Sequence, residues 1–349
     1  MKVQTRFALE KFEVQATAVA GLALVYFALA SLIRPTDPAL PTVFLAGRLW
    51  GQLAVLAGLV AVLSAAAAVA TLSVRPAGAL AAALLAVGGL SLRSCPAVAL
   101  LQYHTDELAG LMILLLLETL LLTAWLALAV AVVLAVRAAG ARLLPAAMWQ
   151  PPLAGLTDNE RTRLAQLMEL RADTPIELFL PASGPFGARL VTENGTKRPV
   201  ANWAGRRRAL QAACLLLAAA ATLVVVLILG QSSLRGQVLA AVFFGGMLGM
   251  LLANYVLPAE LGPLAAAPPM VLALLLYALA LAGVSRGPLA WANLPVYATA
   301  LPLDWLTAGA GGSLFGYWTS QRLHEAQMLE AVIEPPPPET ATRKDASHG

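Results

Sequence analysis

The sequence predicts an all-α integral membrane protein with eight transmembrane helices in two groups of four and a small cytoplasmic helix-plus-hairpin insert. Three observations lead to this fold class. The 349 residues are 59% hydrophobic and 12% charged, with a mean hydropathy of +0.76, whereas a soluble chain carries about a quarter charged residues. The apolar residues gather into long runs, and the cations lie mostly between those runs.

A helix needs about twenty apolar residues to cross the ~30 Å hydrocarbon core of a bilayer. Eight stretches of the sequence are long and nearly free of charged residues. They are residues 14–33, 49–74, 76–92, 108–136, 209–230, 237–257, 269–285 and 292–318. The third stretch is short, and the eighth is weakened by Pro295, Pro302 and a run of glycines. We expect these two helices to be broken.

The cations are unequally divided between the two sides of the predicted bundle. Eighteen of the 23 Lys and Arg residues fall on the side of the termini and of the long central segment. The other side carries Arg34, Arg48, Arg93, Arg235 and Arg286. Because segments rich in Lys and Arg stay in the cytoplasm, both termini and the central segment are predicted to be cytoplasmic. The Ala-, Leu-, Arg- and Pro-rich composition points to a bacterium, so we expect the bacterial inner membrane.

The first 30 residues allow a competing interpretation as a cleaved signal peptide. They have a basic start, an apolar stretch and the sequence Ala28-Leu29-Ala30, which resembles a cleavage site. Glu10 and Glu13 are unusual in such a peptide. Its removal would also place the basic central segment outside. We therefore favour a first transmembrane helix that is retained.

The central segment is predicted to form a small structure of its own. Thr157 and Glu160 have capping-box spacing, which predicts a helix to about residue 172. Asn194-Gly195 is typical of a hairpin turn between strands near 188–193 and 197–201. The central segment has few large apolar side chains and would make a poor hydrophobic core by itself. We therefore expect this unit to dock on the membrane domain or on a protein partner through residues 157–203.

These features divide the chain into four parts. The parts are an N-terminal membrane half at 1–136, a cytoplasmic insert at 137–208, a C-terminal membrane half at 209–318 and a cytoplasmic tail at 319–349, disordered from about residue 334.

Two acidic residues lie inside the apolar stretches, Glu118 and Asp304. A carboxylate at the bilayer centre costs on the order of 3 kcal/mol, so each is a candidate functional residue. Each is expected near the middle of the last helix of its half and has a threonine close by, which suggests two parallel repeats. The structural alternative is a protonated Glu118 that bonds to a neighbouring helix.

Further polar residues precede Glu118. On one continuous helix, His104, Glu107 and Glu118 would share a face. Arg93, at the end of the third stretch, is the expected partner for one of the carboxylates. Alternatively, residues 105–107 cap the helix and complement its dipole.

Catalytic motifs are incomplete in this sequence. His324-Glu325 begins like a zinc-protease motif, but Met328 replaces the second histidine. Residues 309–316 resemble the rhomboid-protease motif, with glycine at the nucleophile position. Two cysteines and three histidines are too few for a haem, an iron–sulfur cluster or a zinc site. We expect no cofactor, metal or nucleic acid, and attribute the pairs Gly245–Gly249 and Gly312–Gly316 to close helix packing.

The stretch from Gly246 to Leu264 resembles a segment of an uncharacterised group of eight-span bacterial membrane proteins. In that group histidine-tryptophan-tyrosine-leucine often stands near this point, whereas Ala253 and Asn254 stand here. The resemblance implies no known activity. Independently, Asn254 and Tyr255 are expected to be anchors at the cytoplasmic interface.

Taken together, the residues favour a non-enzymatic integral subunit or scaffold of a membrane complex, with the bilayer and a cytoplasmic protein as partners. Two alternatives remain. A proton- or cation-coupled transporter would use Glu118 and Asp304 and would need a cavity that water reaches. A quinone- or proton-handling anchor resembles the NrfD family in its four-plus-four arrangement, and would show an apolar crevice with Tyr or His at its end.

Overall fold

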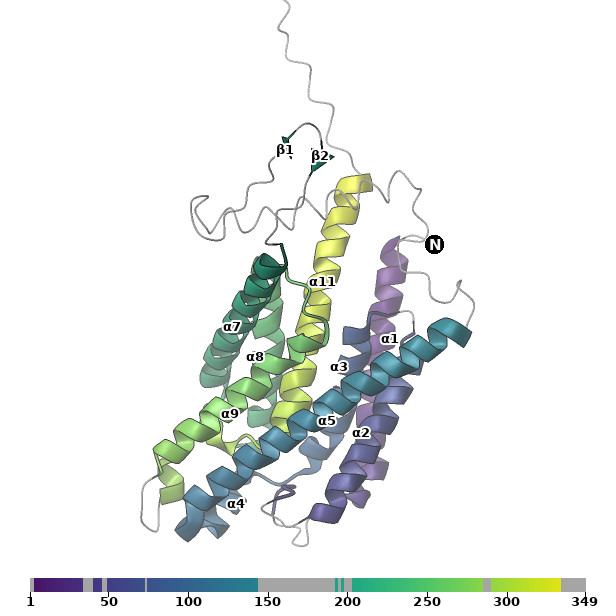
Figure 1. Cartoon of the computed structure of the whole chain (residues 1–349). Coiled ribbons are helices and arrows are strands. Elements are labelled where there is room, and N and C mark those ends of the chain that lie inside the picture. The colour runs from purple at the N-terminus through teal and green to yellow at the C-terminus, as the bar shows by residue number, and fades with distance from the viewer. Residues whose placement is uncertain are drawn as a thin grey trace, which may run out of the picture.

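The protein is a bundle of long helices (Figure 1). The computed structural model describes residues 3–33, 40–45, 49–72, 74–143, 192–193, 196–197, 203–284 and 290–333. Seven helices in these ranges are long and apolar enough to cross a membrane. They are Leu9–Leu32, Trp50–Ala70, Pro76–Arg93, Thr105–Gly140, Arg208–Leu229, Arg235–Val256 and Gly262–Ala282. Seven of the eight predicted stretches are thus found as membrane-length helices.

The N-terminal half contains five α-helices. They are α1 (Val3–Leu24), α2 (Trp50–Ala70), α3 (Pro76–Arg93), α4 (Ala97–Tyr103) and α5 (Leu108–Leu143), with the short helices η1 (Val25–Leu29), η2 (Ala30–Leu32) and η3 (Thr105–Glu107). Pro76 begins α3, where its fixed φ and missing N–H are tolerated. The third helix is unbroken, contrary to our expectation, because its glycines lie against neighbouring helices rather than at a kink.

The C-terminal half begins with α7 and ends with the long helix after Pro302. Its elements are α7 (Trp203–Leu229), α8 (Arg235–Val256), η6 (Gly262–Ala266), α9 (Ala267–Ala282), η7 (Ala290–Asn293), η8 (Val296–Thr299), α10 (Pro302–Asp304), η9 (Trp305–Gly309) and α11 (Ala310–Ile333). Gly262 turns the chain between α8 and α9 with a φ of 55°, which glycine adopts without strain.

One hairpin is described within the predicted insert. Strand β1 (Thr192–Glu193) pairs antiparallel with β2 (Thr196–Lys197), with Glu193 opposite Thr196. This register leaves a two-residue connection, in agreement with the predicted turn. The predicted helix at 157–172 and the tail beyond residue 333 lie outside the described residues.

The last helix differs most from its prediction. α10, η9 and α11 follow one another directly and form a continuous helix over residues 302–333, with a π-helical turn at Trp305–Gly309. Residues 292–299, predicted to be part of the span, instead lie in and between the short turns η7 and η8. The helix is not among the seven candidate spans, because polar residues interrupt its apolar ones.

Two helices lie at the centre of the bundle, α3 and the last helix. Residues 79–84 of α3 are all at most 2% exposed, so this helix is buried on every side. α11 packs against α8 and α3, and Trp305, Leu314 and Tyr317 are buried. Other helices therefore cover the side chains of the last helix, which explains why its low hydropathy is tolerated.

The two halves are not packed alike. α1 packs mainly on α3, whereas its counterpart α7 packs mainly on α8. α5 of the first half also packs on α9 of the second. The predicted parallel repeat is therefore not seen in the arrangement of the helices.

Close packing through glycines is confirmed at both predicted pairs. A Cβ on Gly312 would lie 2.5 Å from the Phe243 carbonyl oxygen of α8, and one on Gly316 would collide with the Met247 carbonyl. On the other face of α8, a Cβ on Gly249 would lie 2.8 Å from the backbone nitrogen of Thr222 in α7. α8 therefore approaches both α7 and α11 at backbone distance.

This packing predicts that Gly316→Ala destabilises the protein, because the added methyl group forces α8 and α11 apart. We expect a loss of about 1–3 kcal/mol, seen as a lower midpoint of thermal unfolding in detergent. Gly110→Ala is the matched control, since nothing lies within 4 Å of its Cβ position. The control should be neutral or slightly more stable, and equal midpoints for both variants would contradict the packing.

Candidate functional site

Six polar side chains meet inside the bundle in what we call the buried polar layer. They are Ser91 on α3, Glu118 on α5, Arg235 on α8, Tyr277 on α9, Asp304 on α10 and Thr307 on η9. Glu118, Asp304 and Thr307 are completely buried. The layer brings the two predicted acidic residues into one region of the structure, with elements from both halves of the chain around them.

Asp304 is held by an ion pair with Arg235. Two guanidinium nitrogens of Arg235, Nη1 and Nη2, each donate to one oxygen of Asp304 at 2.5 Å, and the Leu301 backbone N–H donates to Oδ2 at 2.8 Å. Asp304 lies in the first turn of the last helix and not near its middle as predicted, because the helix begins at Pro302. A carboxylate there complements the helix dipole.

Arg235 also joins the last helix to α3. Its Nε and Nη2 donate to the Ser91 carbonyl oxygen at 3.0 and 2.7 Å. The Ser91 hydroxyl lies 3.0 Å from the hydroxyl of Thr307, which itself donates to the Leu303 carbonyl. The side chain of Arg235 therefore connects α3, α8 and the last helix.

Glu118 binds backbone rather than a side chain. Its Oε2 accepts hydrogen bonds from the N–H groups of Phe44 at 2.9 Å and Leu45 at 3.0 Å. These residues belong to the non-helical connection before α2, where Val43 and Phe44 are buried. Non-helical backbone at membrane depth needs such partners from the protein. Oε1 has no hydrogen-bond partner among the residues that the structure describes.

Tyr277 lies between the two acidic residues. Its hydroxyl donates to the Ala300 carbonyl, and its ring is close enough to Glu118, Asp304 and Arg235 to interact with all three electrostatically. Among the described residues, however, Arg235 pairs with Asp304 alone. The two carboxyl groups therefore share a region but not a cation.

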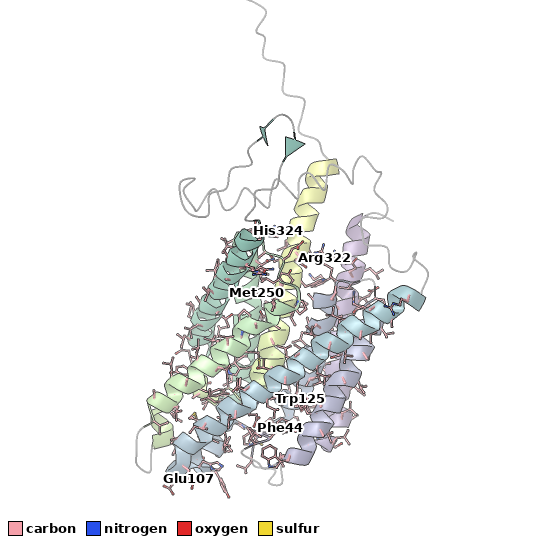
Figure 2. The ribbon with its side chains drawn as sticks, viewed as in Figure 1. Phe44, Glu107, Trp125, Met250, Arg322 and His324 are labelled. Atoms are coloured by element: carbon pink, nitrogen blue, oxygen red, sulfur yellow. The ribbon has the colours of Figure 1, made fainter. Side chains whose placement is uncertain are left out.

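Three predicted site residues lie elsewhere. Arg93 donates to the Tyr26 carbonyl at 2.8 Å and lies 5.9 Å from the centre of its ring, so its predicted pairing with a carboxylate is wrong. His104 ends α4 and packs on Tyr103. Glu107 is exposed at the lower tip of the bundle (Figure 2). The helix is interrupted before residue 108, so these groups do not share a face with Glu118.

Asn254 and Tyr255 form a second polar cluster at the other end of the bundle. Asn254 donates to the Ser320 hydroxyl at 3.2 Å and accepts from the Ala259 N–H at 3.2 Å. The ring of His324 stacks on Tyr255 at 5.4 Å, with Nε2 lying 3.3 Å from the Asn254 carbonyl. Both predicted residues thus fasten α8 to α11, a role beyond that of interfacial anchors.

An ion pair that the sequence did not reveal lies near this cluster. Glu10 of α1 pairs with Arg322 of α11, and both side chains are largely buried. Arg322 and His324 lie in the upper part of α11 (Figure 2). Arg322 and His324 lie within the bundle and not in the predicted cytoplasmic tail, because the last helix continues past residue 318.

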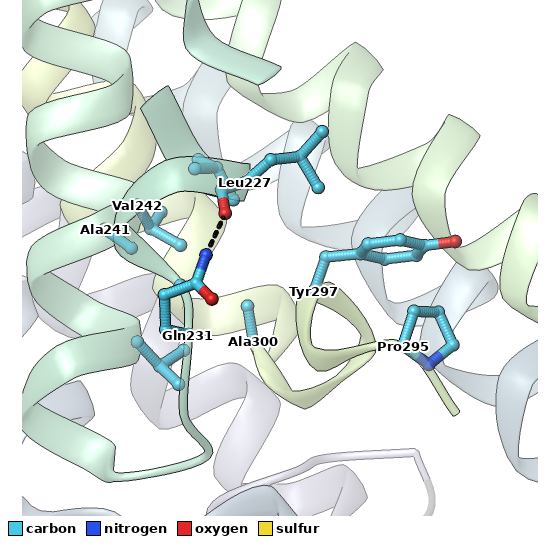
Figure 3. A pocket seen from close by; sticks show the side chains of 10 residues that line it. Leu227, Gln231, Ala241, Val242, Pro295, Tyr297 and Ala300 are labelled. Carbon is cyan, nitrogen blue, oxygen red and sulfur yellow. Dashed lines mark hydrogen bonds between the residues drawn. The ribbon is translucent and has the colours of Figure 1, made fainter. Parts of the chain in front are cut away.

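A small pocket lies beside the buried polar layer. Its volume is about 260 Å³, and α7, α8 and the turn around η8 enclose it. Figure 3 shows Pro295 and Tyr297 on one side, and Leu227 and Gln231 on the other. Its lining is otherwise apolar, and it includes Ala300, whose carbonyl accepts the Tyr277 hydrogen bond. An apolar crevice with a tyrosine at its edge is the feature expected of a quinone site.

The fold and the layer define a helical, polytopic membrane protein whose intramembrane charges bind other parts of the chain. No group of three or more His, Cys, Asp or Glu in the described part of the chain could hold a metal ion. Comparisons with family models, with curated proteins and with solved structures find no match to this chain. The resemblance of residues 246–264 to eight-span proteins therefore stays a prediction.

The ion pair predicts strong coupling between Arg235 and Asp304. Arg235→Ala leaves a buried carboxylate without its cation, which costs about 3–5 kcal/mol. Adding Asp304→Ala removes that charge, so the double variant should be more stable than Arg235→Ala alone. Arg93→Ala, at an exposed arginine, is the control and should cost less than about 1 kcal/mol.

The measurement is the free energy of unfolding in detergent for the wild type, the two single variants, the double variant and the Arg93→Ala control. If the losses in unfolding free energy caused by Arg235→Ala and Asp304→Ala simply add in the double variant, the ion pair does not hold the buried polar layer together.

Proposed function

We propose that the protein is a non-enzymatic integral subunit or scaffold of a membrane complex. The observation that supports this proposal most is that the charged groups in the apolar region are buried and bind other parts of the chain. Residues that carry ions or protons across membranes face a cavity or a bundle interior that water reaches. Here Glu118 and Asp304 are completely buried, and both oxygens of Asp304 are bound by Arg235. This arrangement suits a rigid bundle better than a transport pathway.

The proposed bundle has eight crossings, with residues 302–333 as the eighth. The N-terminal end of α1 and the C-terminal end of α11 lie at the same end of the bundle (Figure 1). An even number of crossings is needed to bring them there, and seven helices are apolar enough to cross alone. The eighth is covered by α3 and α8 and does not need an apolar surface.

We further propose that the end of the bundle with both termini faces the cytoplasm of a bacterial cell. Arg75 directly precedes α3 and Arg208 lies near the start of α7 at this end, and Arg137 near the end of α5 donates to the Thr71 carbonyl. The opposite end carries Arg93 and Arg235, both bound to backbone carbonyls. This distribution agrees with the rule that cations gather on the cytoplasmic side.

A second candidate is a quinone- or proton-handling membrane anchor. One observation favours it, the apolar pocket with Tyr297 at its edge (Figure 3). The pocket is smaller than the 300–1,000 Å³ typical of ligand sites, so it would hold only part of a quinone. The scaffold is therefore the better supported function.

The proposed orientation predicts which residues an impermeant thiol reagent reaches. Cysteines are introduced at Thr196 in the hairpin and at Ala290 in η7, in a protein without Cys95 and Cys214. We expect the reagent to label Ala290→Cys in intact cells, and Thr196→Cys only after the inner membrane is opened. Labelling of Thr196→Cys in intact cells would contradict the orientation.

The scaffold function predicts a partner that binds through residues 157–203. Affinity purification in mild detergent should recover this partner with the full chain and lose it when these residues are deleted. Deletion of residues 335–349 is the control and should leave recovery unchanged. Recovery of the same partner without residues 157–203 would contradict the proposal.

A further inference from the structure

The two carboxyl groups of the buried polar layer are bound in different ways. Asp304 uses both oxygens, and each accepts from a charged guanidinium nitrogen of Arg235 at 2.5 Å. Such a bidentate contact is the geometry of an ionised carboxylate. Glu118 uses only Oε2, which accepts both backbone hydrogen bonds, while Oε1 has no partner. This difference bears on the charge of Glu118.

Among the described residues, no cation pairs with Glu118, and only the two backbone N–H groups of Phe44 and Leu45 would stabilise a negative charge on it. Tyr277 of α9 is close enough to interact electrostatically with Glu118, and also with Asp304 and Arg235. The guanidinium of Arg235 is already engaged by Asp304. α2 and residues 40–45 carry no titratable side chain. An isolated ionised carboxylate with no exposed surface is strongly unfavourable, so the neutral acid is favoured here.

The hydrogen bonds fit a neutral acid as well. A carbonyl oxygen has two lone pairs and can accept two N–H groups, whereas the hydroxyl oxygen of the acid carries the hydrogen. Oε2, with its bonds to Phe44 and Leu45, occupies the role of the carbonyl oxygen. Oε1 is then the hydroxyl. An unpaired neutral hydroxyl costs far less in an apolar interior than an unpaired charge.

We propose that Glu118 is a proton-binding site whose neutral form fastens residues 42–45 to α5, and that loss of the proton releases this segment. On release, the O–H bond at Oε1 breaks, the proton passes to a water molecule and the electron pair stays on the carboxylate. This inference goes beyond the proposed scaffold function. It depends on the membrane bundle, but it does not depend on a protein partner that binds through residues 157–203.

Residues 42–45 are the part of the surroundings of Glu118 that can move aside and admit water. The other described elements against α5 at this depth are helices, whose backbone groups bond within the helix. By contrast, the N–H groups of Phe44 and Leu45 depend on Glu118, and that of Thr42 depends on the Ser94 hydroxyl at 2.8 Å. An ionised Glu118 would gain hydration if this segment moved away, so deprotonation and release are coupled.

Infrared spectroscopy of the purified protein in lipid tests the proton. At neutral pH we expect a carbonyl stretch of a protonated carboxylic acid that shifts in D₂O, is lost in Glu118→Gln and remains, at a different frequency, in Glu118→Asp. Glu107→Gln is the control on an exposed carboxylate one element away, and should leave the band unchanged. If the wild type shows no carboxylic-acid carbonyl band that Glu118→Gln loses, Glu118 is ionised and the proposal is overturned.

Hydrogen exchange at residues 42–45 tests the release. As pH rises, the exchange rate in the wild type should increase more steeply than the intrinsic chemical rate does, because ionised Glu118 lets the segment open. In Glu118→Gln, whose amide oxygen still accepts both bonds and cannot ionise, the exchange rate should rise with pH only as steeply as the intrinsic rate. The same pH dependence in both proteins would contradict the coupling, whatever the thiol labelling shows about orientation.

Discussion

Polar groups can lie at membrane depth only where the protein itself binds them, and this constraint determines the arrangement of the whole bundle. The last helix, residues 302–333, shows it most clearly. Its sequence is too polar to face lipid, and it is not among the seven apolar helices. It lies against α3 and α8 instead, with Trp305 and Tyr317 buried. The more apolar helices therefore provide the surroundings that this helix needs.

The same constraint explains the buried polar layer. Arg235 binds Asp304 and the end of α3, and Glu118 binds the non-helical backbone before α2. A buried ion pair adds little net stability compared with apolar residues of similar size, but its geometry is specific. Arg235 fixes the position of α8 relative to the last helix, and Glu118 fixes the entry to α2 relative to α5. The layer thus sets the register between the two halves.

Seven helices could be predicted within a few residues because each is encoded by a local run of apolar residues. The last helix begins about ten residues later than predicted. A helix that is covered by other helices need not be apolar, so its hydropathy does not reveal where it begins. Glu118 and Asp304 could be found because a charge within an apolar run is conspicuous. Their partners could not, because Arg235 and Phe44 lie 69 and 74 residues away in the sequence. His104 and Glu107 were placed on the face of Glu118 because one continuous helix was assumed, whereas α4 ends at Tyr103.

The central claim is that residues 302–333 cross the membrane inside a shell of other helices. Fluorescence quenching by brominated lipids tests it most directly, in variants that each keep one tryptophan. Trp50 on α2 is 65% exposed and should be strongly quenched, whereas Trp305 is 0% exposed and should be protected. Equal quenching of Trp305 and Trp50 would show that lipid reaches the last helix and would contradict this account.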